Sequence, residues 1–232
     1  MVAVLAHRAR AAGATIETGA VVTTIARGEG GFRLDHTGGS LLADVVVNAA
    51  GADARAIARL AGSDIPVEPI RRNLAYALEP AGAHPLTPMV VDMDTGVLVR
   101  RESAGGWVVC YANPADRPGR EAFVDPRFFE DLARLLPNRF PFLLDLPMDP
   151  ARCWAGLYPE TPDHHAIVGE DPGVPGLFHC AGFGGHGVMH APAAGRAIRE
   201  LVLDGGCTTF DLRPLRPARF AEDDLVVETT VF

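Results

Sequence analysis

The strongest constraint on the fold is a glycine-rich loop between an apolar segment and a helical segment near the C-terminus. The loop reads Gly182-Phe-Gly-Gly-His-Gly187, with the apolar residues 176–181 before it and the helical pattern of residues 188–203 after it. This order matches the glycine fingerprint of dinucleotide-binding folds, in which a pyrophosphate lies at a helix N-terminus. A strand that turns directly into a helix is therefore predicted, which favours an α/β fold.

The fingerprint lacks the part that should follow it. A dinucleotide-binding unit needs a second parallel strand after the helix, with an acidic residue at its end. The segment after this helix, residues 205–211, is short and runs toward Pro214 and Pro217. We therefore interpret the loop as a helix N-terminus whose free N–H groups and positive dipole end face an electron-rich ligand. A glycine-rich turn without a ligand is the alternative.

Length and composition describe a globular chain and exclude several classes of function. The 232 residues are 48% hydrophobic with a mean hydropathy of +0.12, enough for a substantial core. No apolar run reaches the length of a bilayer, and the scattered basic residues of a chain with net charge −8 argue against nucleic acid. The basic residues at the N-terminus follow apolar ones, the reverse of a secretory signal, so a cytoplasmic location is expected.

The first third of the chain is expected to combine a helix, a small antiparallel meander and a buried strand. Residues 41–50 form a near-continuous apolar strand that ends at Gly51, a junction that suits ligand binding at the strand's carboxyl end. The other expected elements are helices at residues 2–12 and 52–60 and strands at residues 15–18, 20–26 and 32–36.

The middle of the chain is expected to be an antiparallel sheet covered by a helix. The helix is predicted over residues 125–136, because Pro126 suits its first turn and its aromatic and leucine side chains fall on one face. The strands are expected at residues 72–78, 89–91, 96–100 and 107–112.

Several segments together resemble the D-amino-acid-oxidase superfamily of FAD-dependent oxidoreductases, in the branch of glycine oxidase and the sarcosine oxidase and proline dehydrogenase β-subunits. These segments are residues 44–51 (Asp-Val-Val-Val-Asn-Ala-Ala-Gly), 154–163 (Trp-Ala-Gly-Leu-Tyr-Pro-Glu-Thr-Pro-Asp), 167–170, 174–177 and 181–195. The resemblance implies an incomplete, Rossmann-like FAD-binding domain with an inserted antiparallel-sheet substrate domain. The implied division is residues 1–64 and 148–205 for the FAD-binding domain, 65–147 for the substrate domain and 206–232 for a C-terminal tail.

The resemblance also implies which residues contact FAD. Val22 packs beside the adenosine end, and Ala50 and Gly51 lie near the ADP moiety. The helix start would stabilise the negative charge that a reduced flavin carries at N1 and the C2 carbonyl. The residues that hold the pyrimidine edge of the isoalloxazine are Gly182, Phe183, Gly184, Gly185, His186, Gly187, Val188 and Met189.

Four of these positions bear on the chemistry that the resemblance implies. Gly156 stands where some relatives carry the cysteine that bonds to flavin, so covalent flavin is not expected. Tyr158 is the candidate for orienting the substrate, with a core tyrosine as the alternative. His186 is the candidate for a hydrogen bond near the flavin ring, with a side chain that points away from the ring as the alternative. Met189 stands where monomeric sarcosine oxidases carry a lysine, and without that cation a dehydrogenase is favoured over an oxidase.

The implied reaction removes a hydride from the carbon next to an amine nitrogen and yields an imine that hydrolyses. Its substrate is a small amine or amino acid such as glycine, sarcosine or proline, and positioning carries more of the catalysis than acid–base residues. The strand and glycine motif with which family members bind the FAD pyrophosphate are missing before Met1. A truncated chain, or a subunit completed by a second chain, is therefore expected, and a non-catalytic subunit is one alternative.

Another alternative is a metal-binding protein that uses His186 and His190. Their spacing puts two imidazoles on one helical face, and a third ligand could come from one of the other histidines. Gly187 replaces the glutamate of the usual H-E-x-x-H motif, which argues against this reading. Arg71 and Arg72 are expected at the surface, with an anionic substrate as their alternative partner.

Overall fold

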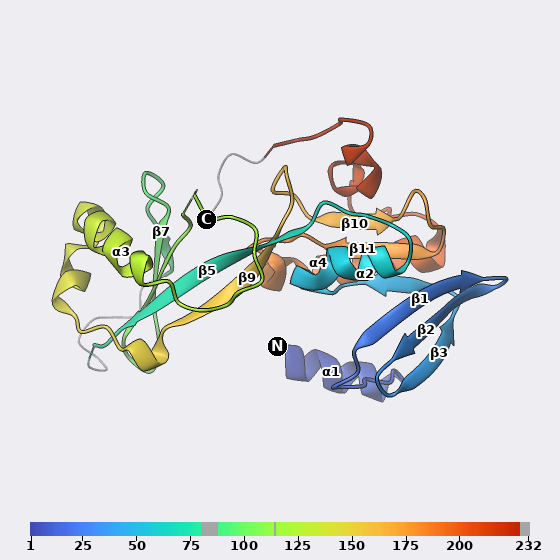
Figure 1. Ribbon diagram of the computed structural model, residues 1–232, viewed down its shortest axis with the longest axis horizontal. Helices are drawn as coiled ribbons and strands as arrows, with labels where there is room; N and C mark the ends of the chain where they lie inside the picture. The colour runs from blue at the N-terminus through green and yellow to red at the C-terminus, as the bar shows by residue number, and fades with distance from the viewer. Residues whose placement is uncertain (80–87, 114, 228–232) are drawn as a thin grey trace.

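The computed structural model describes residues 1–79, 88–113 and 115–227, which form three β-sheets flanked by helices (Figure 1). The strands are β1 (Val22–Gly28), β2 (Gly31–His36), β3 (Gly39–Ala43), β4 (Val46–Asn48), β5 (Glu68–Ala77), β6 (Val90–Val91), β7 (Val97–Arg101), β8 (Trp107–Tyr111), β9 (Trp154–Glu160), β10 (Ile167–Glu170) and β11 (Leu177–Ala181). The α-helices are α1 (Val2–Ala11), α2 (Ala54–Leu60), α3 (Pro126–Arg139) and α4 (Gly187–Asp204). The 3₁₀ helices are η1 (Gly51–Asp53), η2 (Pro141–Asp145), η3 (Pro150–Arg152), η4 (Arg213–Leu215) and η5 (Pro217–Phe220).

The sheet that carries the glycine loop has the order β10-β11-β4. β11 pairs in parallel with β4, so that Leu177 lies opposite Val46, and antiparallel with β10. α4 follows β11 through the glycine loop and packs its buried Ala197 and Ile198 against Val168 and Phe178. The predicted strand, loop and helix are thus confirmed, and the carboxyl ends of β4 and β11 lie at the same edge of the sheet.

A second, antiparallel sheet has the order β1-β2-β3 and is the meander that the sequence predicts. Two details differ. No strand forms at residues 15–18, where β-branched residues have no neighbouring strand to pair with. The single strand expected at residues 41–50 is two strands, because the chain leaves the meander after Ala43 and joins β11 from Val46 onward.

The third sheet, with the order β6-β7-β8-β5-β9, is antiparallel and is covered on one face by α3. Asp125 caps α3 by accepting from the N–H of Arg127, and Pro126 occupies the first turn, as expected. β9 lies in the segment assigned to the FAD-binding domain, yet it pairs along its whole length with β5. These two strands connect the two ends of the molecule (Figure 1). β9 thus belongs to the five-stranded sheet, whose other strands lie in the segment assigned to the substrate domain. The domain division itself stays a prediction.

The C-terminal segment is anchored to the rest of the chain through Arg219. This side chain is fully buried, and it donates from Nε and Nη2 to the carboxylate of Asp163 at 2.7 and 2.9 Å. On the surface, Glu222 and Asp224 accept hydrogen bonds from Arg216. Within the described ranges, no helix is long and apolar enough to cross a membrane.

Candidate functional site

The glycine loop packs directly on β9. The N–H of Gly184 donates to the carbonyl of Pro159 at 2.9 Å. A Cβ added at Gly185 would lie 2.7 Å from the Tyr158 ring, and one added at Gly184 would lie 3.1 Å from Oε1 of Glu160. Both distances are shorter than ordinary carbon contacts. The structure therefore brings Tyr158 together with the loop, and the loop reaches β9 this closely because Gly184 and Gly185 have no side chains.

The backbone conformation of the loop also requires glycine. Gly182 and Gly184 have φ values of +73° and +52°, in the left-handed region that side chains disfavour. A Cβ at Gly182 would in addition lie 2.6 Å from Cγ2 of Thr161, the residue that follows β9. The shape of the loop is thus fixed by two independent requirements, conformation and close packing.

The N-terminus of α4 is available for an electron-rich group. His186 is its N-cap residue, and no side chain forms a capping hydrogen bond there. The first N–H groups of a helix lack partners within the helix, and they carry the positive end of its dipole. Val188 and Met189 in this first turn are 65% and 59% exposed. This arrangement fits the pyrimidine edge of a flavin, whose N1 and C2 carbonyl carry negative charge on reduction.

Gly156 leaves open space on the strand that carries Tyr158. It lies opposite Arg72 in the register of β5 and β9, and no heavy atom lies within 4 Å of the Cβ position. Tyr158 is half-buried, and this burial raises the pKa of its hydroxyl, so the phenol stays protonated at neutral pH. An open strand surface beside a neutral hydroxyl fits a flat ring held without a covalent bond.

Arg72 is buried, not exposed, so the surface placement expected for it is wrong. Its exposed fraction is 6%, and it donates from Nη1 to Asp116 at 3.2 Å. Its neighbour Arg71 points to the other face of the sheet, where it donates to Asp125 at 3.0 Å. Successive residues of a strand face opposite sides, and here both sides are covered by other segments of the chain.

The residues predicted beside the ADP moiety lie near the ends of β1 and β4. Gly51 has a φ of +56° and no heavy atom within 4 Å of its Cβ position, so the turn after β4 is open. Ala50 donates from its N–H to Oδ1 of Asn48 at 3.3 Å. Val22, the first residue of β1, packs against the core cluster that includes Ile25. The contacts of these residues with a cofactor stay predictions.

A buried hydrogen-bonded network behind this turn was not predicted. Asn48 donates from Nδ2 to the carbonyl of Ala54 at 2.8 Å, and the same atom lies 3.3 Å from Nδ1 of His179. Nε2 of His179 lies 2.9 Å from Asp171, which also accepts from Ser63. The sequence signal for this network was the presence of Asn48 and His179 in two otherwise apolar strands. The network ties the carboxyl end of β4 to β11, and so fixes the Gly51 turn relative to the glycine loop.

Burial decides the charge of the histidine in this network. His179 is fully buried, and burial lowers its pKa despite the opposing effect of Asp171. For Asp171, burial acts to raise the pKa, but hydrogen bonds from Ser63 and His179 outweigh it and hold the pKa below its ordinary value. A neutral imidazole beside an ionised carboxylate is therefore the form that the fold favours.

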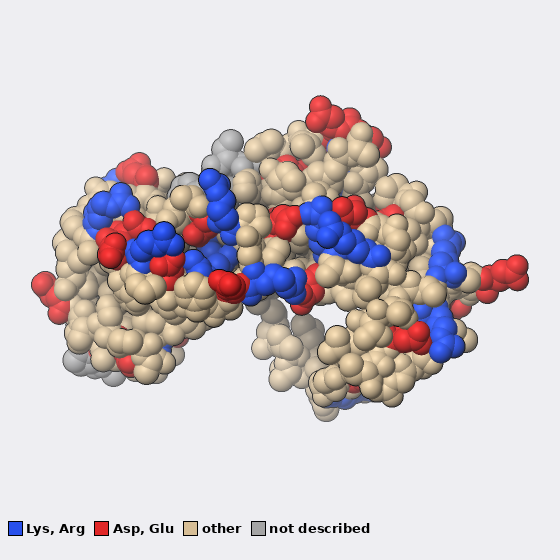
Figure 2. Space-filling view, in the orientation of Figure 1, with Lys and Arg blue, Asp and Glu red and all other residues tan. Residues whose placement is uncertain are grey.

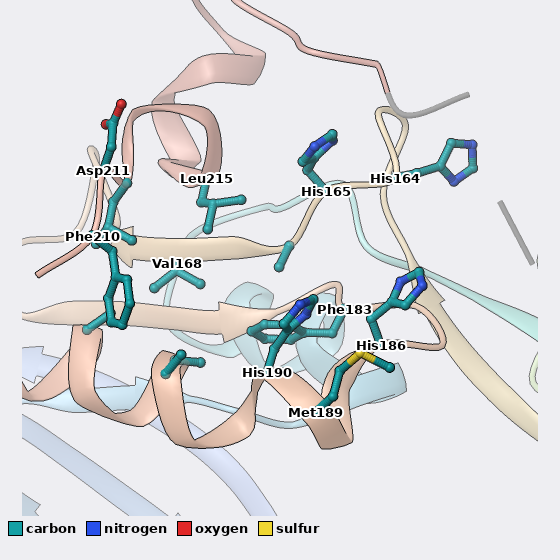
Figure 3. A pocket seen from close by; sticks show the side chains of 15 residues that line it. His164, His165, Val168, Phe183, His186, Met189, His190, Phe210, Asp211 and Leu215 are labelled. Atoms are coloured by element: carbon teal, nitrogen blue, oxygen red, sulfur yellow. The ribbon is translucent and has the colours of Figure 1, made fainter. Parts of the chain in front are cut away.

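A cavity of about 700 Å³ lies between α4, β10 and the C-terminal segment (Figure 3). His186, Met189 and His190 line it from α4, and His164 and His165 line it from the turn before β10. The ring centroids of His186 and His190 are 6.1 Å apart. Among the residues that the structure describes, no group of three metal-ligating side chains is suited to hold an ion. Within the described part of the chain, a metal site at His186 and His190 therefore has no third ligand.

Acidic and basic side chains are interspersed over the face of the molecule that Figure 2 shows. Many charged side chains of the described residues pair with one another, for example Arg134 with Asp131 and Arg139 with Asp94. On this face there is no continuous basic stripe of the kind that follows a phosphate backbone.

Comparisons with known proteins agree with the geometry. A family described as FAD dependent oxidoreductase matches residues 1–201. The chain is 34% identical over 208 residues to FAD-dependent oxidoreductase domain-containing protein 1 of Xenopus laevis, covering 83% of this chain and 41% of that protein. It is 28% identical over 174 residues to peroxisomal sarcosine oxidase of Mus musculus, covering 69% and 44%. The chain thus spans less than half the length of these relatives.

Two solved structures share the fold over almost the entire chain. L-proline dehydrogenase from P. horikoshii superposes with a TM-score of 0.87 at 25% identity, covering 97% of this chain and 60% of that one. Glycine oxidase from Geobacillus kaustophilus superposes with a TM-score of 0.79 at 28% identity, covering 94% and 56%.

Proposed function

Since the chain belongs to the family of FAD-dependent oxidoreductases, we propose that it forms the flavin-ring side of an enzyme that oxidises a small amine or amino acid. The proposed substrate class is that of glycine, sarcosine and proline. It is taken by analogy from the relatives named sarcosine oxidase, glycine oxidase and L-proline dehydrogenase. The observation that carries the proposal is the packing of the glycine loop on Tyr158, next to a helix N-terminus that no side chain caps.

In this proposal the flavin, when bound, accepts the hydride, and the residues of this chain position the reactants. The N–H groups at the start of α4 stabilise negative charge on the ring, because the positive end of the helix dipole lies there. Gly156 leaves room for the ring, and Tyr158 orients the substrate with its protonated hydroxyl. His186 is the other candidate contact, since it is the N-cap residue of the same helix.

We propose a dehydrogenase in preference to an oxidase, because the exposed Met189 brings no charge to the first turn of α4. The test is anaerobic titration of the FAD-loaded protein with glycine, sarcosine and proline. Loss of the flavin band near 450 nm is expected with at least one of them. A retained flavin that none of the amines bleaches would refute amine oxidation. Rapid return of the band in air, with hydrogen peroxide formed, would show an oxidase instead.

A second candidate is a subunit completed by another polypeptide that supplies the pyrophosphate-binding part. Two exposed features favour it. α1 has no buried residue, and its Val2 and Val4 are 76% and 55% exposed. β4 is an edge strand among the described strands, and its Val47 is 42% exposed. Unpaired strand edges and apolar helix faces are normally covered.

Co-expression with a polypeptide that carries a nucleotide-binding glycine motif tests this second candidate. Co-purification and a higher flavin content are the expected results. A flavin content unchanged by the added polypeptide would refute the need for it. The cytoplasmic location stays a prediction.

A further inference from the structure

The cavity of about 700 Å³ between α4, β10 and the C-terminal segment, here called the α4 cavity, is far larger than glycine, sarcosine or proline requires. Cavities of about 300–1,000 Å³ hold ligands of drug size. Protein interiors are otherwise packed as closely as organic crystals, with few voids larger than a water molecule. A space of this size between three segments of the chain is therefore a reason to expect a bound group.

The walls of the α4 cavity are apolar over most of its length. One wall is α4 itself, with the small side chains of Ala193, Ala194 and Ala197. Other walls are formed by Val168 of β10 and Leu215 of η4. Among the described residues that line the cavity, none is a lysine or an arginine. An anionic group would meet no fixed positive charge here, whereas an apolar group would gain from leaving water.

The two ends of the α4 cavity differ in polarity (Figure 3). One end is lined by His164 and His186, and the other by Phe210 and Asp211. The carboxylate of Asp211 is exposed and accepts a hydrogen bond from the N–H of Arg213 at 2.9 Å. The cavity therefore suits an elongated ligand that has a polar head at the histidine end and an apolar tail toward Phe210.

The histidine end is continuous with the glycine loop. The residues that line both are Phe183 and His186 of the loop and Met189 in the first turn of α4. In the proposed function, the flavin ring and the carbon–nitrogen bond that is oxidised lie at this loop. Met189 and Ala197 are about 12 Å apart along the helix axis, which exceeds the length of a hexyl group. A substituent that leaves the reacting carbon at the loop can thus extend along α4 toward Phe210.

We propose that the α4 cavity holds a large apolar substituent of the substrate, an aromatic ring or an alkyl chain. The inference rests on the proposed function and narrows its substrate class to amines and amino acids that carry such a substituent. Ala193, Ala194 and Ala197 are then specificity-determining residues, because larger side chains there would fill the space. Glycine and sarcosine leave the cavity to water and lose a gain of about fourfold in affinity for each buried methylene.

The test compares substrates that differ only in the substituent, on FAD-loaded protein. Sarcosine is paired with N-methylphenylalanine, and dimethylamine with N-methylhexylamine. The concentration that half-reduces the flavin under anaerobic conditions is expected to be at least about tenfold lower for the larger member of each pair. Equal concentrations, or lower ones for the small members, would overturn the inference and leave the proposed function standing.

Ala193→Leu fills the α4 cavity from a position where the new side chain should not impair folding, since Ala193 is exposed and leucine favours helices. The variant is expected to lose at least about tenfold of the preference for the larger substrates, with sarcosine and dimethylamine unchanged. Ala191→Leu is the matched control, because Ala191 is an exposed residue of α4 outside the cavity lining, and it should keep the preference. Phe210→Ala replaces the first variant if Ala193→Leu fails to fold, since Phe210 is 39% exposed and lies at the far end of the cavity. It should weaken N-methylhexylamine and leave dimethylamine unchanged.

Binding without chemistry gives a second readout, by saturation-transfer NMR of N-methylhexylamine with the full chain. The amine is expected to bind the wild type and Ala191→Leu, and to bind Ala193→Leu at least about tenfold more weakly. No binding by the wild type, or equal binding by Ala193→Leu, would overturn the inference. If none of the four amines reduces the flavin, the proposed function fails, and the NMR comparison alone decides whether the α4 cavity binds an apolar substituent.

Discussion

Removal of the Arg219 guanidinium is expected to destabilise the protein strongly, because it leaves the buried charge of Asp163 without its partner. Both side chains are 0% exposed, and they are joined by two hydrogen bonds of 2.7 and 2.9 Å. Breaking a buried pair in this way costs about 3–5 kcal/mol. For a chain of 232 residues, about 2–4 °C of Tm per kcal/mol gives a decrease of about 6–20 °C for Arg219→Met.

The lower end of that range is favoured, since Asp163 keeps two other donors. Thr161 donates from its hydroxyl at 3.1 Å and His165 from its N–H at 3.3 Å. The assay is thermal unfolding followed by circular dichroism. Arg213→Met is the control, because Arg213 is 74% exposed in its pair with Asp224 and such pairs contribute about 0–1 kcal/mol. Equal Tm values for the two variants would refute the role given to the buried pair.

The pH dependence of the same pair has a definite sign. Burial acts to raise the pKa of Asp163, but the hydrogen bonds and charge of Arg219 outweigh it, so the pKa lies below its ordinary value. As the pH falls below about 4, the Asp163 carboxylate is therefore protonated in the unfolded chain before it is protonated in the folded one. The stability that the ionised pair contributes is lost progressively as the pH falls. In Arg219→Met this contribution is absent, so its loss of stability in acid should be smaller.

Two other predictions concern the glycine loop and the buried network. Gly185→Ala places a Cβ 2.7 Å from the Tyr158 ring and should lower the free energy of unfolding by about 1–3 kcal/mol. Gly195→Ala is the control and should not lower the free energy of unfolding, because a Cβ at this position meets nothing within 4 Å. Equal urea midpoints for the two variants would contradict the close packing of the loop. Burial holds the pKa of His179 below its ordinary value, so the unfolded chain binds that proton first, and stability falls as the pH drops below about 6.5. His179→Gln should therefore lose less Tm than the wild type between about pH 7.5 and about pH 5.5, whereas the control His7→Gln, at an exposed position, should behave like the wild type.

Elements with strong local signals were predictable from the sequence. α4 was expected over residues 188–203 and is Gly187–Asp204, because glycines bound an apolar helical pattern at both ends. α3 was expected to end at residue 136, before Pro137, but it continues to Arg139. The strand expected at residues 15–18 does not form, since strand propensity acts only where a partner strand is present.

The polar contacts that shape the candidate site were not predictable in the same way. Arg72 pairs with Asp116 and Arg219 with Asp163, over separations of 44 and 56 residues. Nothing in the sequence around either arginine distinguishes it from a surface residue, because its burial depends on segments that are distant in the sequence. The glycine loop was found from its own sequence pattern and Tyr158 through the resemblance to a family, and the structure shows the contact between them.

The central claim is that this chain holds the ring of FAD, and flavin retention tests it most directly. The purified protein is incubated with excess FAD, desalted and examined by absorbance spectroscopy. We predict that a flavin band near 450 nm remains with the protein, with its maximum shifted from that of free FAD by the new surroundings of the ring. A desalted protein without a flavin band would contradict the claim that this chain by itself holds the ring, and would favour the subunit completed by another polypeptide.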